Sequence, residues 1–143
     1  MQVKEIMTQG VDTIAPDATV RDAAQKMQQL DIGPVPVCDG ERLMGMLTDR
    51  DITIRVVAAG CDPATTKVRE VMTPDVVYCF EDQDAQEAAR VMERHQIRRL
   101  PVLNRNKWLV GIVSLGDLAV RSGNPTLAGE TVEQVSEPAA PKR

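Results

Sequence analysis

Aromatic residues are almost missing from this sequence of 143 residues, which holds one Trp, one Tyr and one Phe. A chain so poor in aromatic rings lacks the stacking platforms with which many proteins hold single-stranded nucleic acid. The 17 Lys and Arg residues are interspersed among 21 Asp and Glu residues and the net charge is −4, so no basic face suited to a duplex is indicated. We therefore expect no nucleic-acid binding, and a core of Val, Ile, Leu, Met and Ala.

Patterns for metal binding, secretion and membrane insertion are lacking as well. The sequence has a single histidine, His95, and its three cysteines, Cys38, Cys61 and Cys79, form no C-x-x-C pair. It contains neither the zones of a signal peptide nor an apolar run long enough to span a bilayer. We expect structural roles for these four residues, no metal site, no membrane association and a location in the reducing cytoplasm.

An internal repeat organises what is present. A shift of 65 residues places V-K-E-I-M-T, which starts at Val3, over V-R-E-V-M-T, which starts at Val68. One extra residue within the turn at 104–108 changes the shift to 66, after which Asp51 matches Asp117. A duplication tolerates an insertion in a turn. The sequence therefore predicts one repeat over 1–60, a linker at 61–67, a second repeat over 68–123, and an irregular, mobile tail at 124–143.

Each copy passes through the same order of hydrophobic patterns. A short β-rich run precedes an amphipathic helix, and two further β-rich runs joined by a turn precede a second helix. We expect these elements at 11–14, 19–30, 34–37, 43–47 and 49–59 in the first copy, and at 76–80, 84–95, 100–103, 109–113 and 115–121 in the second. The order predicts an α+β fold of two β-α-β-β-α repeats, which are small enough that they must pack together to be stable.

The pattern most relevant to chemistry is a glycine-led apolar strand, a hydroxyl residue, and an Asp three positions later where a helix opens. It is written G-M-L-T-D-R-D in the first copy and G-I-V-S-L-G-D in the second. The carboxylates of Asp51 and Asp117 suit the 2′ and 3′ hydroxyls of a ribose. The hydroxyls of Thr48 and Ser114, with the helix-opening N–H groups, suit a phosphate. The pattern therefore indicates a site for a nucleoside phosphate.

The same spacing also describes a capping box, in which the two side chains satisfy the free N–H groups of a helix. Thr19 and Asp22 have this spacing at the start of the first helix, where no glycine-led strand precedes them and capping explains the pair. Spacing alone leaves both interpretations open. The recurrence of the glycine-led strand in both copies favours ligand binding.

Taken together, V-x-E-[IV]-M-T, I-x-x-[VL]-P-V and G-h-h-[ST]-x-x-D (h, apolar) in tandem resemble a pair of CBS (cystathionine-β-synthase) domains, also called a Bateman module. The resemblance covers nearly all of both repeats. It implies pseudo-two-fold packing of the two units, with dimers of modules common. It further implies two clefts in which AMP, ADP, ATP, NAD or S-adenosylmethionine binds.

The resemblance also assigns residues to the two clefts. One cleft would combine Met46, Thr48 and Asp51 with Ile97 and Arg98, and the other would combine Ile112, Ser114 and Asp117 with Ile32 and Gly33. Basic residues before the h-P-V strand meet phosphates in family members, a role that Arg98 and Arg99 would take here, supplemented by Arg50. The first copy has Gly33 and Pro34 in that place. We expect clefts of unequal phosphate affinity, and occupancy of one or both stays open, as does a purely solvated role for the two arginines.

A catalytic role is not expected, because the sequence shows no nucleophile with a paired base, no metal constellation and no phosphate-binding loop with Lys. No catalytic cofactor is therefore expected. The resemblance implies a regulatory module that binds an adenosine-containing ligand, forms a homodimer and transmits its occupancy to an unknown partner protein in trans. The alternative is a structural dimerisation or interaction module whose clefts are empty or degenerate.

Overall fold

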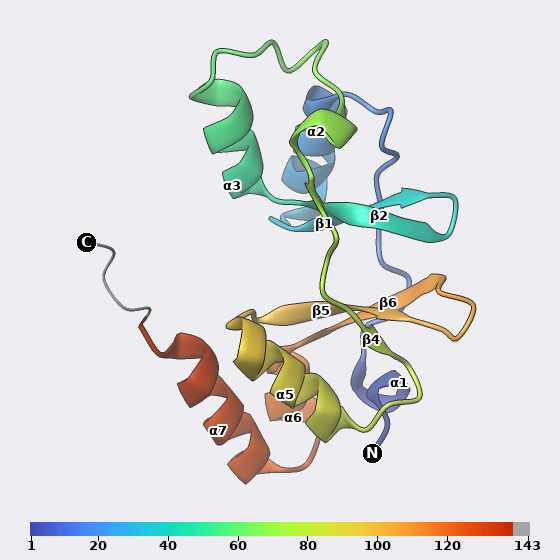
Figure 1. The fold of residues 1–143 in the computed structure, drawn as a ribbon, viewed down its shortest axis with the longest axis vertical. Coiled ribbons are helices and arrows are strands. Elements are labelled where there is room, and N and C mark those ends of the chain that lie inside the picture. Colours follow the sequence, from blue (N-terminus) through green and yellow to red (C-terminus); the bar gives the residue numbers. More distant parts are fainter. Residues whose placement is uncertain (139–143) are drawn as a thin grey trace. The chain divides into compact units, whose positions relative to one another are not determined.

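In the computed structural model, which describes residues 1–138, the chain forms two compact units (Figure 1). One unit is continuous in sequence and consists of residues 12–76, and we call it the continuous unit. The other, the discontinuous unit, joins residues 1–11 to the chain from residue 77 onwards. Each unit has its own three-stranded sheet and its own aliphatic core. The predicted α+β fold is confirmed.

The continuous unit places its helices against an antiparallel sheet of order β1-β2-β3. Its elements are α2 (Val20–Leu30), β1 (Val35–Asp39), β2 (Arg42–Leu47), α3 (Asp49–Ile52), the π-helical segment η1 (Thr53–Val57), α4 (Val68–Val71) and β3 (Thr73–Pro74). Val20, Ala23 and Met27 of α2 share a core with Val35 and Leu47 of the sheet.

The discontinuous unit repeats this arrangement and adds one helix. Its elements are α1 (Val3–Ile6), β4 (Cys79–Phe80), α5 (Ala85–His95), β5 (Arg99–Leu103), β6 (Leu109–Ser114), α6 (Leu115–Arg121) and α7 (Pro125–Ser136). Strand β4 is parallel to β5, and β5 is antiparallel to β6. None of the helices within residues 1–138 is long and apolar enough to cross a membrane.

The long helices form where the apolar spacing predicts them, and their ends are capped by a side chain at the start and by a backbone N–H group at the finish. Thr19 caps the start of α2 and Asp84 caps the start of α5. Both helices end on a residue in the left-handed conformation, Asp31 and Gln96, each with φ of 52°. Helix 49–59 was predicted as one α-helix, but the structure has a short α-helix followed by η1.

The V-x-E-h-M-T motifs are exchanged between the repeats, which the sequence did not indicate. Helix α1, from the first copy, packs in the unit built by the second copy. The amide of Val3 donates to the carbonyl of Gln83 at 2.8 Å, and the amide of Lys4 donates to the carbonyl of Glu81 at 2.9 Å. The compact units therefore do not coincide with the sequence copies.

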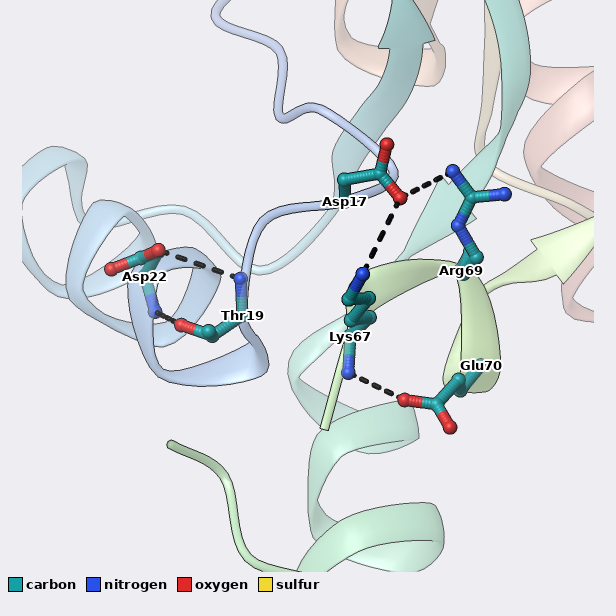
Figure 2. A network of polar contacts seen from close by, with 6 residues as sticks. All are labelled: Asp17, Thr19, Asp22, Lys67, Arg69 and Glu70. Carbon is teal, nitrogen blue, oxygen red and sulfur yellow. Dashed lines mark hydrogen bonds and ion pairs between the residues drawn. The ribbon is translucent and has the colours of Figure 1, made fainter. Parts of the chain in front are cut away.

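Helix α4 is held in the continuous unit by the matching contacts. The amide of Val68 donates to the carbonyl of Ala18 at 2.9 Å, and the amide of Arg69 donates to the carbonyl of Pro16 at 3.0 Å. Figure 2 shows the Asp17 carboxylate in an ion pair with the Arg69 guanidinium above the start of this helix. Backbone pairing and charge together fix α4 to residues that lie some fifty positions earlier in the chain.

Glycine leads each G-h-h-[ST]-x-x-D strand because the exchanged motif passes directly over it. A Cβ atom on Gly45 would lie 2.6 Å from the carbonyl oxygen of Thr73, and one on Gly111 would lie 2.7 Å from that of Thr8. In the sequence, the recurrence of this glycine favours ligand binding. The structure gives it a packing role, so the glycine no longer supports that interpretation.

Two further expectations differ from the structure. Residues 125–136 were expected to be part of a mobile tail, but they form α7, which Asn124 caps through a hydrogen bond from the Leu127 amide at 3.0 Å. Helix α7 packs against α5 and α6 and buries Val135 in their core. The rest of that expectation, 139–143, lies outside the described residues. The run at 11–14 forms an isolated bridge from Ile14 to Val37 instead of a strand.

Candidate functional site

The structure gathers the predicted site residues into one cluster in each unit, where the last long strand meets the following helix. The Thr48 half-site, in the continuous unit, consists of Ile32, Gly33, Met46, Thr48, Arg50 and Asp51. The Ser114 half-site, in the discontinuous unit, consists of Ile97, Arg98, Arg99, Ile112, Ser114 and Asp117.

Antiparallel pairing builds both clusters in the same way. Met46 of β2 lies opposite Pro36 of β1, and Ile112 of β6 lies opposite Pro101 of β5. This register places each hydroxyl residue at the end of its strand, beside the loop that precedes the h-P-V strand.

At the Thr48 half-site, the hydroxyl and the carboxylate form a reciprocal capping box. The Thr48 hydroxyl accepts from the Asp51 amide at 3.1 Å, and the Oδ2 atom of Asp51 accepts from the Thr48 amide at 3.0 Å. The Asp51 side chain is half-buried. These bonds hold the carboxylate in one orientation and engage its Oδ2 atom.

The Ser114 half-site repeats the same bonds with tighter burial. The Ser114 hydroxyl accepts from the Asp117 amide at 3.1 Å, and Oδ2 of Asp117 accepts from the Ser114 amide at 2.9 Å. The Asp117 side chain is 12% exposed, and its Oδ1 atom lies 3.9 Å from Nη1 of Arg121. Its free oxygen therefore faces a cation within the same unit.

The capping interpretation is confirmed for both pairs, and for Thr19 and Asp22, whose two bonds measure 3.1 and 3.4 Å (Figure 2). Capping does not use up either carboxylate of the two half-sites, because the cap engages Oδ2 and leaves Oδ1 for another donor. The two interpretations of the spacing are thus compatible.

Several of the helix-opening N–H groups that we expected to meet a phosphate already have partners. The Asp49 amide donates to the Gly33 carbonyl at 3.2 Å, and the Leu115 amide donates to the Arg98 carbonyl at 2.9 Å. The Asp51 amide, in turn, donates to the Thr48 hydroxyl. These three amides are therefore not free to bind a phosphate.

Arg98 and Arg99 lie beside Ser114 within their own unit. The Arg98 carbonyl receives the Leu115 amide, next in sequence to Ser114, and Arg99 lies directly opposite Ser114 in the β5–β6 register. The family resemblance had grouped Arg98 with Asp51. That grouping would join the two units and stays a prediction, whereas the contacts described here join Arg98 to the Ser114 half-site.

The aligned residues of the two half-sites differ in charge. Where the Ser114 half-site has Arg98 next to Leu115, the Thr48 half-site has Gly33 next to Asp49. A Cβ atom on Gly33 would lie 3.0 Å from Oδ1 of Asp49, so that carboxylate covers the glycine. Asp49 was not among the predicted site residues; alignment of T-D-R-D with S-L-G-D places it opposite Leu115, but its contact with Gly33 is seen only in the structure.

A pair of aligned arginines was also missed. Nη1 of Arg55 donates to the carbonyls of Val71 and Met72 at 2.8 and 3.2 Å, at the end of α4. Arg121 makes the same contacts with the last carbonyls of α1, both at 3.4 Å. Because cations stabilise helix C-termini, both arginines help to hold the exchanged motifs in place. Arg121 also forms an ion pair with Asp117 of the Ser114 half-site. Within residues 1–138, Arg55 forms no ion pair with Asp51.

The buried cysteines show no sign of reactivity. Burial raises the pKa of the Cys38 thiol to about 11 and the pKa of the Cys79 thiol to about 12, so both stay protonated near neutral pH. Within residues 1–138, no group of three or more His, Cys, Asp or Glu side chains is placed to hold a metal ion.

A family model described as "CBS domain" matches residues 3–58 and again residues 68–122. The chain belongs to the CBS domain family. The resemblance inferred from the three motifs is therefore confirmed, and the chain is a CBS pair. The CBS domain-containing protein YhcV of Bacillus subtilis is 43% identical to it over 134 residues, which make up 94% of each chain. Hypoxic response protein 1 of Mycobacterium tuberculosis is 44% identical over 117 residues, 81% of each chain.

Solved structures of CBS proteins have the same fold. The crystal structure of Hypoxic Response Protein I with two coordinated zinc ions matches with a TM-score of 0.76 at 43% identity, covering 83% of this chain and 97% of that one. The crystal structure of CBSX2 in complex with AMP matches with a TM-score of 0.73 at 23% identity, covering 85% of this chain and 95% of that one. At that identity the second likeness shows the fold alone.

Proposed function

We propose that this CBS pair is a non-catalytic regulatory module that binds an adenosine-containing ligand with a phosphate, such as AMP, ADP or ATP. The observation that carries the proposal is the placement of Arg98 and Arg99 beside the Ser114–Asp117 pair in one unit. The backbone brings a hydroxyl, a carboxylate and two arginines into one part of this unit, and these residue types suit the ribose and the phosphate of a nucleotide. The same fold holds AMP in CBSX2.

Each group has a distinct role in this proposal. Asp117, oriented by its cap, accepts hydrogen bonds from the ribose hydroxyls through Oδ1. Arg98 and Arg99 meet the phosphate, for which guanidinium groups are well suited, and Ser114 contributes its hydroxyl. Ile97 and Ile112 offer aliphatic contacts to the adenine ring. NAD, which carries a second ribose, is the alternative ligand.

Occupancy changes the function of a partner only if the ligand binds one arrangement of the module more tightly than another. We propose that an unidentified protein senses this difference in trans, that the module works as a homodimer, and that it does so in the cytoplasm. No enzymatic step is proposed, because neither half-site pairs a nucleophile with a base.

The alternative function is a structural dimerisation or interaction module whose sites stay empty. It is favoured by the fact that each site carboxylate already has a complete structural role in its capping box. Ligand binding and capping make different predictions for the same substitutions.

A thermal-shift panel of AMP, ADP, ATP, NAD and S-adenosylmethionine tests the proposal. A ligand present at about one hundred times its Kd adds roughly 2.7 kcal/mol to the free energy of unfolding. We expect a phosphate-bearing ligand to raise the Tm of the wild-type protein and to lose that effect in Asp117→Ala. Asp22→Ala is the matched control, because it removes a capping box outside both half-sites.

The two functions are separated by the outcome. If Asp117→Ala and Asp22→Ala each lower the basal stability by about 1 kcal/mol and no adenosine ligand shifts the wild-type Tm, the structural module is supported and the sensor proposal fails.

A further inference from the structure

Arg121 lies between the Ser114 half-site and the exchanged helix α1. Its Nη1 atom is 3.9 Å from Oδ1 of Asp117. The same atom donates to the last carbonyls of α1, those of Ile6 and Met7, both at 3.4 Å. All three distances exceed those of a well-formed hydrogen bond to a guanidinium group. One guanidinium nitrogen is therefore shared between the carboxylate of the half-site and the end of α1.

The aligned arginine of the continuous unit is not shared in this way. Nη1 of Arg55 donates to the last carbonyls of α4 at 2.8 and 3.2 Å, and in the described part of the chain it forms no ion pair with Asp51. The helix geometry explains the difference. Asp117 and Arg121 are four residues apart in one α-helix, a spacing that brings side chains together. The chain from Asp51 to Arg55 passes into the π-helical segment η1, whose turn is wider.

The internal hydrogen bonds of the two exchanged helices are the same, so they do not explain the longer contacts of Arg121. Within α1, the Met7 amide donates to the Val3 carbonyl at 2.9 Å. Within α4, the Met72 amide donates to the Val68 carbonyl, also at 2.9 Å. These two amides therefore form a matched pair of reporters for the ends of the helices.

Ion pairs hold the exchanged motifs as well, but at their other ends. Arg69, in the first turn of α4, pairs with Asp17. The N-terminal ammonium group of Met1, before α1, lies 3.7 Å from the carboxylate of Asp84. Neither pair reaches the last carbonyls of its helix, which are the groups that the two aligned arginines contact.

On the basis of the proposed function, we propose that Arg121 transmits the occupancy of the Ser114 half-site to α1. A ribose that donates its hydroxyls to Oδ1 of Asp117 competes with the guanidinium group for that atom. Arg121 then moves fully onto the last carbonyls of α1, as Arg55 already does on α4, and holds the end of α1 more tightly. The tightened segment at 1–11 is what the partner protein senses. Arg55 supplies no such link, so binding at the Thr48 half-site leaves α4 unchanged.

Hydrogen exchange measured by NMR at the amides of Met7 and Met72 tests this link, with AMP as the probe and calorimetry to establish that AMP is bound. In the wild type we expect saturating AMP to slow exchange at Met7 by about fivefold or more and to leave Met72 unchanged. In Arg121→Gln, AMP still binds but exchange at Met7 no longer responds. Arg55→Gln is the matched control, in which Met72 exchanges faster and the response of Met7 is kept.

A second pair of variants tests the sharing of Arg121 without any ligand. Asp117→Asn removes the charge that attracts the guanidinium group and keeps an oxygen atom that can accept from the Ser114 amide, so the cap is retained. We expect exchange at Met7 to slow by up to about fivefold. Asp51→Asn makes the same change in a cap that shares no arginine, and it should leave Met72 unchanged.

The inference is overturned if AMP binds the wild type without slowing exchange at Met7, or if Arg121→Gln keeps the full response. It is also overturned if Asp117→Asn fails to slow exchange at Met7 in the absence of ligand. The proposed function is judged separately, by calorimetry. If AMP does not bind and another ligand of the panel does, that ligand replaces AMP in the same comparison. If the wild type binds no ligand of the panel, the proposed function fails and the inference fails with it.

Discussion

The Thr48 and Ser114 half-sites are built on the same backbone frame, and charged residues distinguish them at four aligned positions. In each, a glycine-led strand passes under an exchanged motif, a hydroxyl residue caps the next helix, and an Asp completes the cap. Gly33, Pro34, Asp49 and Arg50 in one correspond to Arg98, Arg99, Leu115 and Gly116 in the other. The hydroxyl and the Asp cap a helix in both units, so the charged residues around them have to determine what each half-site binds.

The largest effects on stability are expected from substitutions of the two glycines that lead the strands of the half-sites. Gly45→Ala and Gly111→Ala each place a Cβ atom against a backbone carbonyl, at 2.6 and 2.7 Å, and we expect both to lower the free energy of unfolding by about 3 kcal/mol. Urea denaturation measures the loss. If one substitution is harmless, the two frames are not equivalent.

Gly129→Ala is the matched control for this pair. A Cβ atom at this position in α7 meets nothing within 4 Å, and alanine favours helix over glycine, so we expect a gain of up to about 1 kcal/mol.

Smaller losses of stability are expected when the arginines that hold the exchanged motifs are substituted. We expect Arg55→Gln to cost about 1 kcal/mol and Arg121→Gln to cost less, because the hydrogen bonds of Arg55 are 2.8 and 3.2 Å and those of Arg121 are 3.4 Å. Hydrogen exchange should quicken in α4 for the first variant and in α1 for the second. Arg90→Gln, at an exposed position of α5, is the control and should quicken neither.

Much of the fold was predictable, because it depends on contacts between neighbours in sequence. The helices at 20–30 and 85–95 follow from apolar spacing and from caps such as Thr19. The exchange of α1 and α4 was not predictable, since the hydrogen bond from the Val3 amide to Gln83 joins distant segments that share no pattern. Helix α7 was missed because Pro125, Gly129 and a weak apolar stripe resemble a loop.

The candidate site was predictable to the same extent. The spacing of Thr48 and Asp51 is a local signal that predicted the cap, which is confirmed, and the ribose clamp, which stays a prediction. The position of Asp49 over Gly33 depends on how a helix meets a preceding loop, so it became visible only in the structure. The proximity of Arg121 to Asp117 follows from their i, i+4 spacing in α6, whereas the contacts of Arg121 with the carbonyls of Ile6 and Met7 depend on the docking of α1.

Titration of AMP into the Asp51→Ala and Asp117→Ala proteins tests the central claim most directly, namely that the Ser114 half-site is the one that holds a nucleotide phosphate. Isothermal calorimetry should show AMP binding to Asp51→Ala as tightly as to the wild type, and a loss of at least about tenfold in Asp117→Ala. The opposite pattern, with AMP binding lost in Asp51→Ala and kept in Asp117→Ala, would contradict the claim. It would indicate that Arg98 contacts the phosphate of a nucleotide bound at the Thr48 half-site.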